Sequence, residues 1–313
     1  MSLKILQAGL QTTVQAAPRT GQRHWGVPWS GAADSLSCSL ANAVIGNTPD
    51  AAALEITYGQ FSVRFDTSMR FALMGAPAPA SLDGGPVAYG EPVDAAAGAT
   101  LTLAAPAAGV RTYLAVAGGI SVPSFMGSQS TYPPASLGGH EGRALIDGDR
   151  LAVGLPLANA RAAVIPKSLH VTLSDHWRLR LHPGADVTQG SALHRQLYTE
   201  VFSATRRADR MGIQIEGPEL DCRRDDTMDS VPVFPGTVQV PPDGRPFILL
   251  CDAQTTGGYP RLGHIARVDR HKLGQIRPGD RVQFLEVSAE TARRAFAAKQ
   301  ETLRDVGLEN ALF

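Results

Sequence analysis

The stretch Gly279-Asp280-Arg281-Val282-Gln283-Phe284-Leu285-Glu286-Val287 places a Gly-Asp turn directly before a predicted terminal strand. Gly and Asp both favour tight turns, because Gly adopts positive φ and Asp bonds to the nearby backbone. Gly148-Asp149-Arg150-Leu151 repeats this pattern in the first half of the chain. Earlier in each half an apolar strand runs into a Gly-Gly pair, at Tyr113–Gly119 and Ile248–Gly258. The two echoes predict two units of similar fold.

On either side of these repeated patterns, the chain consists of short β-rich runs separated by turn residues. The chain holds 32 glycines and 22 prolines, and they recur roughly every 8 to 12 residues, which is typical of an all-β sandwich or barrel. The expected strands are Leu3–Gln7, Ser62–Phe65, Arg70–Met74, Thr100–Leu103, Arg111–Val116, Arg178–Leu181, Gly212–Ile215, Phe247–Cys251, Ile265–Val268 and Arg281–Val287.

Three segments are expected to be helical. Ser35–Ile45 follows Asp34, a good N-cap, and Gly46 stands where a helix C-cap falls. Ser191–Phe202 is the second segment. The third, Ser288–Leu303, carries a weak apolar stripe and is expected to pack as a terminal helix, with a frayed tail as the alternative.

Length and these patterns together predict two domains. At roughly 150 residues per domain, 313 residues suffice for two. We expect a mostly β chain with one unit over residues 1–160, a second over 165–287, and a C-terminal helix and tail over 288–313. The Ala-rich stretch Leu155–Pro166 is the expected linker.

Composition narrows the class of protein. Hydrophobic residues make up 43% and charged residues 19%, and 29 basic residues balance 29 acidic ones. This balance argues against a general nucleic-acid or membrane-surface binder. Three scattered cysteines form no disulfide framework or metal pattern. The N-terminus lacks a signal peptide, and no run of about 18 apolar residues occurs. We therefore expect a soluble cytoplasmic protein.

Familiar catalytic motifs are missing. The sequence has neither common nucleotide-binding fingerprint and no Gly-x-Ser-x-Gly elbow. Its eight histidines show no zinc-ligand spacing, so no metal site is expected. Any chemistry is expected to depend on hydrogen bonding and positioning.

The sharpest candidate site is the loop Gln254-Thr255-Thr256-Gly257-Gly258-Tyr259-Pro260. Two adjacent glycines allow positive φ, so their N–H groups can converge on an anion or a carbonyl oxygen. The side chains of Gln254, Thr255 and Thr256 add donors and acceptors that suit an amide. The structural alternative is a tight β-turn.

Four further segments carry candidate polar residues. Gly127–Thr131 contributes Ser128 and Ser130, and Arg143 closes Gly138–Arg143. Arg143 is suited to clamp a carboxylate or phosphate, or to pair structurally with Asp147 or Asp149.

Trp29–Asp34 supplies the hydroxyl of Ser30 and the carboxylate of Asp34, which is the expected helix N-cap. Asp209 and Arg210 offer an ion pair on a turn.

Taken together and in their order along the chain, these sequence motifs resemble subunit 2 of allophanate hydrolase, also called the biotin-dependent carboxyltransferase family. That family includes the Kip antagonist and the C subunit of 5-oxoprolinase. The resemblance covers Leu3 to Val287. The matching strings are Gly9–Gln15, Gly26–Asp34, Ala41-Asn42, Gly46-Asn47, Leu54-Glu55, Tyr113–Ile120, Gly127–Thr131, Gly138–Arg143, Gly148-Asp149, Asp209–Gly212, Val238–Gly244, Gln254–Pro260 and Arg277–Asp280.

The sequence departs from the family pattern at three places. Gln15-Ala16-Ala17-Pro18-Arg19 lacks the usual acid, although Arg19 remains. Gln214-Ile215 replaces an Arg-Leu pair, and Pro183-Gly184 reverses a Gly-Pro step.

The resemblance implies two tandem cyclophilin-like β-barrel units with a few short helices and a C-terminal helix. It also implies a Kip-inhibitor-like subunit 1 as partner and, for 5-oxoprolinase, a third barrel-type subunit and ATP. We expect a subunit of ATP-dependent 5-oxoprolinase, a hydrolase of a cyclic amide that needs its partner for activity. The alternatives are the carboxyltransferase half of a biotin-dependent urea carboxylase, the only case that involves biotin, and a non-catalytic antagonist of a histidine-kinase inhibitor.

The expected site residues are divided by role. Asp34, Arg143, Asp209 and Arg210 are the candidates for catalysis. The candidates for substrate binding are Ser30, Asn42, Ser128, Ser130, Gln254, Thr255, Thr256, Gly257, Gly258 and Tyr259.

Overall fold

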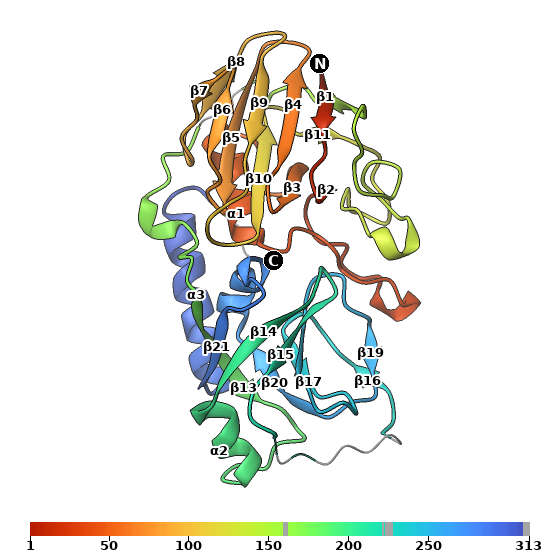
Figure 1. Ribbon diagram of the computed structural model, residues 1–313, viewed down its shortest axis with the longest axis vertical. Coiled ribbons are helices and arrows are strands. Elements are labelled where there is room, and N and C mark those ends of the chain that lie inside the picture. The colour runs from red at the N-terminus through yellow and green to blue at the C-terminus, as the bar shows by residue number, and fades with distance from the viewer. Residues whose placement is uncertain (159–161, 221, 223–227, 309–313) are drawn as a thin grey trace. The chain divides into compact units, whose positions relative to one another are not determined.

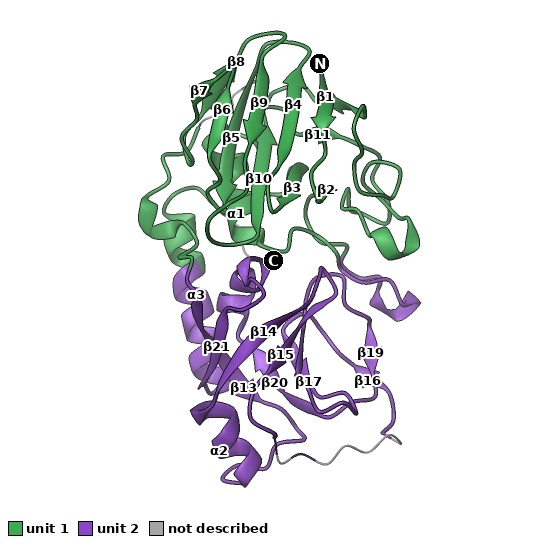
Figure 2. Cartoon of the chain, in the orientation of Figure 1, with its two compact units in different colours: residues 1–19, 30–173, 300–313 green, residues 20–29, 174–299 purple. Residues whose placement is uncertain are grey.

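The computed structural model describes residues 1–158, 162–220, 222 and 228–308, and Figure 1 shows its strands and helices. The predicted mostly β class is confirmed. Two compact units are distinguished in Figure 2. Unit 1 comprises Met1–Arg19, Ser30–Leu173 and Gln300–Phe313, and unit 2 comprises Thr20–Trp29 and Ser174–Lys299. This division differs from the predicted bounds, and the expected linker lies partly outside the described residues.

Unit 1 is built from two antiparallel sheets. In spatial order, the seven strands of the first are β11 (Ile120–Ser121), β12 (Arg150–Val153), β1 (Ser2–Gln7), β4 (Phe61–Phe65), β9 (Thr100–Leu103), β6 (Ala80–Leu82) and β7 (Gly85–Pro86). The five strands of the second are β2 (Gln11–Gln15), β3 (Ala53–Thr57), β10 (Arg111–Val116), β5 (Met69–Gly75) and β8 (Val93–Ala95).

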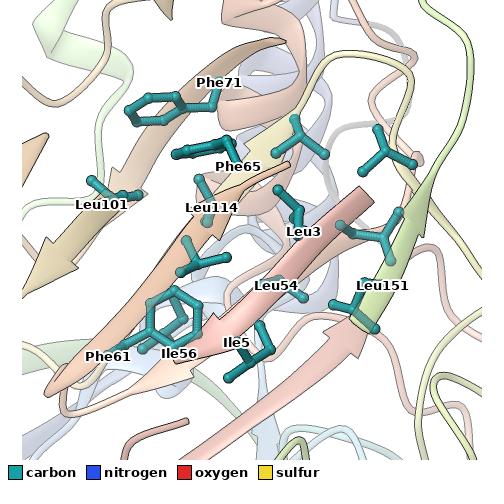
Figure 3. Close-up of a cluster of buried hydrophobic side chains, with 14 of the residues drawn as sticks. Leu3, Ile5, Leu54, Ile56, Phe61, Phe65, Phe71, Leu101, Leu114 and Leu151 are labelled. Atoms are coloured by element: carbon teal, nitrogen blue, oxygen red, sulfur yellow. The ribbon is translucent and has the colours of Figure 1, made fainter. Parts of the chain in front are cut away.

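One hydrophobic core joins both sheets of unit 1, and Figure 3 shows its centre. Strand β4 illustrates why the sequence folds this way. Phe61, Val63 and Phe65 are fully buried, while the residues between them are partly exposed, as the period-2 alternation of a strand requires. Phe65 stacks on Phe71 of the other sheet with ring centroids 5.2 Å apart.

Helix α1 (Ser35–Val44) packs on β5 and β10 and is buried along its whole length. Its N-cap is Asp34, whose carboxylate accepts a hydrogen bond from the Ser37 N–H at 3.0 Å. Gly46 has φ of 78° just beyond the C-cap. The predicted start at Ser35 is confirmed, and the helix ends at Val44, one residue before the predicted Ile45. Unit 1 also holds two short 3₁₀ helices, η2 (Pro133–Ala135) and η3 (Lys167–Leu169).

Unit 2 is a closed barrel in which the first strand pairs in parallel with the last. Around the barrel the strands are β13 (His176–Pro183), β20 (Arg261–Ile265), β17 (Thr237–Gln239), β18 (Phe247–Leu249), β15 (Gly212–Glu216), β14 (Val201–Ala208) and β21 (Arg281–Glu286). The remaining elements are the pair β16 (Val231–Pro232) and β19 (Thr256–Gly257), with η1 (Arg23–Trp25), α2 (Ala192–Thr199), η4 (Arg267–Gln275) and α3 (Ala289–Arg304).

The two predicted Gly-Asp turns have the same local geometry. Gly148 and Gly279 adopt φ of 94° and 91°. In each turn the aspartate carboxylate accepts a hydrogen bond from the backbone N–H three residues earlier, at 2.9 Å for Asp149 and 2.8 Å for Asp280. Each turn then leads into a strand, β12 in unit 1 and β21 in unit 2. The echo in the sequence is therefore a repeated structural device.

One predicted strand is wrong and two predicted elements are shorter than expected. The segment Ile265–Val268 is predicted to be a strand. In the structure β20 ends at Ile265, and the 3₁₀ helix η4 begins at Arg267. The Asp269 N–H donates to the Ala266 carbonyl oxygen at 2.8 Å and closes a turn there, and its buried carboxylate binds Arg180 and Lys272. Strand β18 stops at Leu249, and α2 stops at Thr199 because Glu200 is extended.

Candidate functional site

The Gln254–Tyr259 loop of unit 2 presents polar side chains that the fold leaves unused. Within the described residues, the side chains of Gln254, Thr255, Thr256 and Tyr259 form no hydrogen bonds. Thr256 is exposed and Tyr259 is 37% exposed. A Gln amide and Thr hydroxyls both donate and accept. The loop can therefore bind a planar amide through its carbonyl oxygen and its N–H group.

A buried ion pair supports the base of this loop. Arg210 donates to both carboxylate oxygens of Asp252, at 2.8 and 3.0 Å, and their side chains are only 4% and 1% exposed. The Asp252 N–H also donates to the Arg210 carbonyl oxygen at 2.9 Å. Arg210, a predicted catalytic residue, therefore supports the loop through its hydrogen bonds to Asp252.

The two glycines of the loop do not adopt the conformation expected of them. Neither Gly257 nor Gly258 has positive φ. Gly257 instead lies in β19, and a Cβ there would stand 3.0 Å from Gln239 Oε1. A Cβ on Gly258 would stand 2.9 Å from the Met228 carbonyl oxygen. Close approach to the Met228 carbonyl oxygen, and not turn geometry, favours glycine at position 258, whereas at position 257 the nearest group is the tip of the Gln239 side chain.

Arg23 is a functional candidate that the sequence analysis missed. Its guanidinium lies over the Trp29 and Phe234 rings, 5.5 and 4.8 Å from their centroids. Its Nη2 donates to the carbonyl oxygens of Thr255 at 3.1 Å and Gln254 at 3.4 Å, and to that of Val233. Burial lowers the pKa of Arg23. A cation thus lies against the backbone of the candidate loop.

In unit 1, Asp34 belongs to a buried polar network. Its carboxylate accepts from the Ser37 hydroxyl at 2.6 Å, and its N–H donates to the Tyr113 hydroxyl at 2.8 Å. Tyr113 in turn donates to Glu55 at 2.8 Å, and Glu55 lies 3.3 Å from Arg111. Burial, followed by the nearby carboxylates, raises the pKa of Tyr113. The network holds the chain rigidly where α1 begins.

Ser30 stands four residues before Asp34 in a strained conformation. Its φ is 53°, in the left-handed region that non-glycine residues rarely adopt. Its side chain is 3% exposed, and its hydroxyl oxygen has no hydrogen-bond partner among the described residues. Strain and an unsatisfied hydroxyl both mark functional positions more often than ordinary turns.

The other unit 1 candidates are satisfied internally. Asn42 donates to the Ala51 carbonyl oxygen at 2.8 Å. The Ser128 hydroxyl donates to the Ala17 carbonyl oxygen at 2.6 Å, and Ser130 Oγ accepts from the Ala16 N–H at 3.0 Å. These hydrogen bonds assign the three side chains to holding the unit 1 loops.

Arg19 reinforces the same loops. Its side chain is fully buried. It donates to the carbonyl oxygens of Phe125 at 3.0 Å and Ser130 at 2.8 Å. This arginine, retained where the chain lacks the acid of the family pattern, therefore fixes the Gly127–Thr131 loop.

Arg143 and Asp209 also have local partners. Arg143 donates to both oxygens of Asp149, at 2.7 and 3.0 Å, which is the structural pairing foreseen as an alternative. The Arg143 hydrogen bond lowers the pKa of Asp149. Asp209 accepts from the N–H groups of Met211 and Gly212 at 2.7 and 3.1 Å, closing a turn.

Unit 2 also contains a half-buried basic cluster on η4 and β20. Arg270 Nη2 lies 2.6 Å from His264 Nε2, and Thr237 Oγ1 lies 3.3 Å from His264 Nδ1. Because arginine can only donate, His264 accepts at Nε2 and carries its proton on Nδ1. Burial, then Arg270 and His182, lowers the pKa of His264 to about 4. The imidazole is therefore neutral at physiological pH.

None of the predicted site residues lines either of two clefts, although Asn47, which lines the second, donates to Asn42 Oδ1 at 2.9 Å. The first, of about 540 Å³, is in unit 2 and is lined by the carboxylates Glu216, Glu219 and Asp243 with Arg245. The second, of about 520 Å³, is in unit 1 and is lined by Asn47, Asp305 and mainly apolar residues. In the described part of the chain, no three His, Cys, Asp or Glu residues gather as metal ligands. No helix among these residues has the length and hydropathy needed to cross a membrane.

Comparison with known proteins shows the family of the chain. The family model of the carboxyltransferase domain, subdomain A and B, matches residues 25–286. The chain belongs to the carboxyltransferase domain family. The matched region of this carboxyltransferase-domain protein includes both the α1 network and the Gln254–Tyr259 loop.

Individual relatives point to two kinds of enzyme. This chain is 41% identical to the C subunit of 5-oxoprolinase from Escherichia coli (strain K12), over 94% of each chain. It is 29% identical to urea amidolyase of Saccharomyces cerevisiae, over 93% of this chain but 17% of that protein. The Kluyveromyces lactis urea carboxylase structure matches it with a TM-score of 0.91 at 30% identity, over all of this chain and 30% of that one.

Proposed function

We propose that this carboxyltransferase-domain protein is a subunit of an ATP-dependent 5-oxoprolinase, which hydrolyses the lactam of 5-oxoproline to glutamate. It acts with a Kip-inhibitor-like subunit 1 and a third, barrel-type subunit, and is inactive without them. ATP is a co-substrate of the whole assembly. The cytoplasm is the proposed compartment.

The observation that carries the proposal is the unused hydrogen-bonding capacity of the Gln254–Tyr259 loop. A lactam is a planar amide with one acceptor and one donor, and Gln and Thr side chains complement both. The 41% identity to a 5-oxoprolinase subunit over nearly the whole length of both chains supports the choice of substrate.

The polar residues of unit 1 have a separate part in the proposal. Asp34 and its network fix the start of α1, and the strained Ser30 offers one unsatisfied hydroxyl beside it. We assign Asp34 to positioning the start of α1 within unit 1. Arg143, Asp209 and Arg210 support their loops through the hydrogen bonds described above.

The test is reconstitution of the three-subunit assembly. The purified chain is combined with its cognate subunit 1 and third subunit, and glutamate formation is followed with ATP and 5-oxoproline. We expect glutamate only when all components are present. A stable complex that forms no glutamate would refute this substrate assignment.

Carboxyl transfer to a small neutral amide is the second candidate function. The likeness to urea carboxylase of Kluyveromyces lactis favours it, since it extends over the whole chain. This activity requires a biotinylated partner. Transfer of label from carboxybiotin to urea, with no turnover of 5-oxoproline, would support this function over the first.

A further inference from the structure

The segment Thr20–Trp29, here called the arm, belongs to unit 2 although it lies far from the rest of that unit in sequence. Its 3₁₀ helix η1 buries no residue, and Trp25 is 72% exposed. Two backbone hydrogen bonds, from the N–H groups of Trp25 and Gly26, lie within the arm. Pro28 is buried and the Trp29 ring lies 6.0 Å from the Phe234 ring, so the packing of the arm is confined to its C-terminal end.

Arg23 is the tether of the arm. Among the described residues, every hydrogen bond from the arm to the remainder of unit 2 starts at Arg23 Nη2. These bonds reach the carbonyl oxygen of Val233, just after β16, and those of Gln254 and Thr255, just before β19. The Arg23 guanidinium also lies over the Phe234 and Trp29 rings.

Among the described residues, no carboxylate neutralises the charge of Arg23. Within the described residues no carboxylate lies within 4.0 Å of its guanidinium, and Nη1 is enclosed without a hydrogen-bond partner. Aromatic faces and carbonyl oxygens stabilise a cation, but each supplies only partial negative charge. Arginine remains protonated in proteins. A full positive charge therefore lies beside the backbone of the candidate substrate loop.

From this geometry we infer that Arg23 is a positioning and specificity-determining residue. It fixes the backbone of Gln254 and Thr255, and its charge favours amides that carry a carboxylate over neutral amides. The second statement rests on the proposed function, because 5-oxoproline bears a carboxylate and urea does not. Nη2 is occupied by carbonyl groups and Nη1 is enclosed, so Arg23 acts on the substrate through its field.

The positioning role is tested on the isolated full-length chain, without any assumption about substrate. Hydrogen exchange is measured for Arg23→Gln, Arg23→Lys and the control Arg206→Gln. Arg206 is an exposed arginine of β14 in the same unit and has no ion pair among the described residues. We expect Arg23→Gln to speed exchange of the amides of Val233 and residues 254–259 by roughly tenfold, as one local hydrogen-bonded contact is lost.

The other two variants set the limits of this result. Arg206→Gln is expected to leave the exchange rates unchanged. Arg23→Lys keeps the charge but loses the planar guanidinium, so its exchange rates are expected to lie between those of Arg23→Gln and those of the parent chain. Circular dichroism verifies that each variant is folded. Unchanged exchange in folded Arg23→Gln would overturn the positioning role.

The specificity role is tested in the reconstituted assembly with a matched pair of lactams. Pyrrolidin-2-one is the 5-oxoproline ring without its carboxylate, and its inhibition constant is compared with the Michaelis constant of the carboxylate-bearing substrate. In Arg23→Gln the preference for 5-oxoproline is expected to fall roughly fivefold, the effect of two unit charges about 4 Å apart that are screened as in bulk water. Arg23→Lys is expected to keep the preference while losing turnover on account of the weakened tether.

The outcomes separate this inference from the proposed function. An unchanged preference in Arg23→Gln, with an active parent assembly, would overturn the specificity role alone. An inactive parent assembly would overturn the proposed function and, with it, the specificity role. In that case the exchange measurement still decides whether Arg23 positions the loop.

Discussion

The polar loops of unit 1 and the Gln254–Tyr259 loop of unit 2 are built from similar residues but use them in opposite ways. In unit 1 the hydroxyls of Ser128 and Ser130 and the guanidinium of Arg143 bind neighbouring groups of the same unit. In unit 2 the side chains of Thr255 and Thr256 stay unbonded within the described residues, while the backbone beneath them is fixed by Arg23. Composition alone does not separate a supporting loop from a binding loop, whereas hydrogen-bond availability does.

The largest expected effect comes from removing the support under the unit 2 loop. Arg210→Met removes the two hydrogen bonds that Arg210 donates to the buried Asp252 carboxylate and is expected to lower the free energy of unfolding by about 3–5 kcal/mol. The loss is measured by denaturant unfolding, followed through Trp25, Trp29 and Trp177, which all belong to unit 2.

The control for this change removes both charges. The double variant Arg210→Met with Asp252→Leu is expected to recover most of the lost stability, since no charge stays buried without a partner. A loss below about 1 kcal/mol in the single variant would contradict the support role of Arg210.

Acid is expected to weaken unit 2 next. The pKa of His264 is about 4 in the folded chain and 6.5 ordinarily, so the unfolded chain binds more protons between these values. The stability is fully present above about pH 6.5 and is lost as the pH falls towards 4, by about 3 kcal/mol at most. Protonated His264 can no longer accept from Arg270 and also faces His182.

A conservative variant isolates this effect. His264→Gln keeps an acceptor for Arg270 but does not titrate, so its unfolding free energy is expected to change less with pH across this window. Tryptophan fluorescence at a series of pH values makes the measurement. An equally steep loss in the variant would assign the acid sensitivity to another group, such as the buried His271, whose pKa burial lowers to about 3.

Removing the two free hydroxyls separates binding from support. Thr255→Ala with Thr256→Ala is expected to reduce 5-oxoproline turnover of the assembly roughly a hundredfold, equal to about 2.7 kcal/mol. Stability is expected to change by less than about 0.5 kcal/mol, because no internal hydrogen bond is lost. Thr→Ser at both positions, which retains the hydroxyls, serves as the control. Full turnover in the alanine variant would remove the loop from the site.

The converse change in unit 1 has the smallest expected effect. Ser128→Ala deletes a hydroxyl that donates to the Ala17 carbonyl oxygen and accepts from the Ser130 N–H at 3.0 Å. The expected loss is about 1–2 kcal/mol of stability, with turnover per folded molecule retained. A larger loss of turnover than of stability would place Ser128 in the substrate site and erase the contrast between the units.

Local rules predicted much of the fold. The N-cap at Asp34, the positive φ at Gly46 and the paired Gly-Asp turns all follow from interactions within a few residues. Strand β4 follows from its alternation of buried and partly exposed positions. These elements were predictable because their causes lie in adjacent sequence.

The errors arise where the cause is distant in sequence. Beyond Ile265 the chain turns into η4, where the Asp269 carboxylate binds Arg180, which lies 89 residues away. A Cβ on Gly258 would stand 2.9 Å from the Met228 carbonyl oxygen, and two adjacent glycines in a sequence do not reveal such a neighbour. Arg23 was missed because its hydrogen-bond partners lie more than 200 residues further along the chain.

The parallel pairing of β13 with β21 has a consequence for how the chain is made. The barrel of unit 2 closes between its first and last strands, which are separated by about a hundred residues. Such non-local closure is slow, because a long loop must be ordered before the contact forms. On the ribosome the barrel cannot close until β21 has emerged, so β13 and β14 wait with unpaired edges. During that interval the unpaired strand edges can pair with other chains, which favours aggregation, and they are accessible to chaperones.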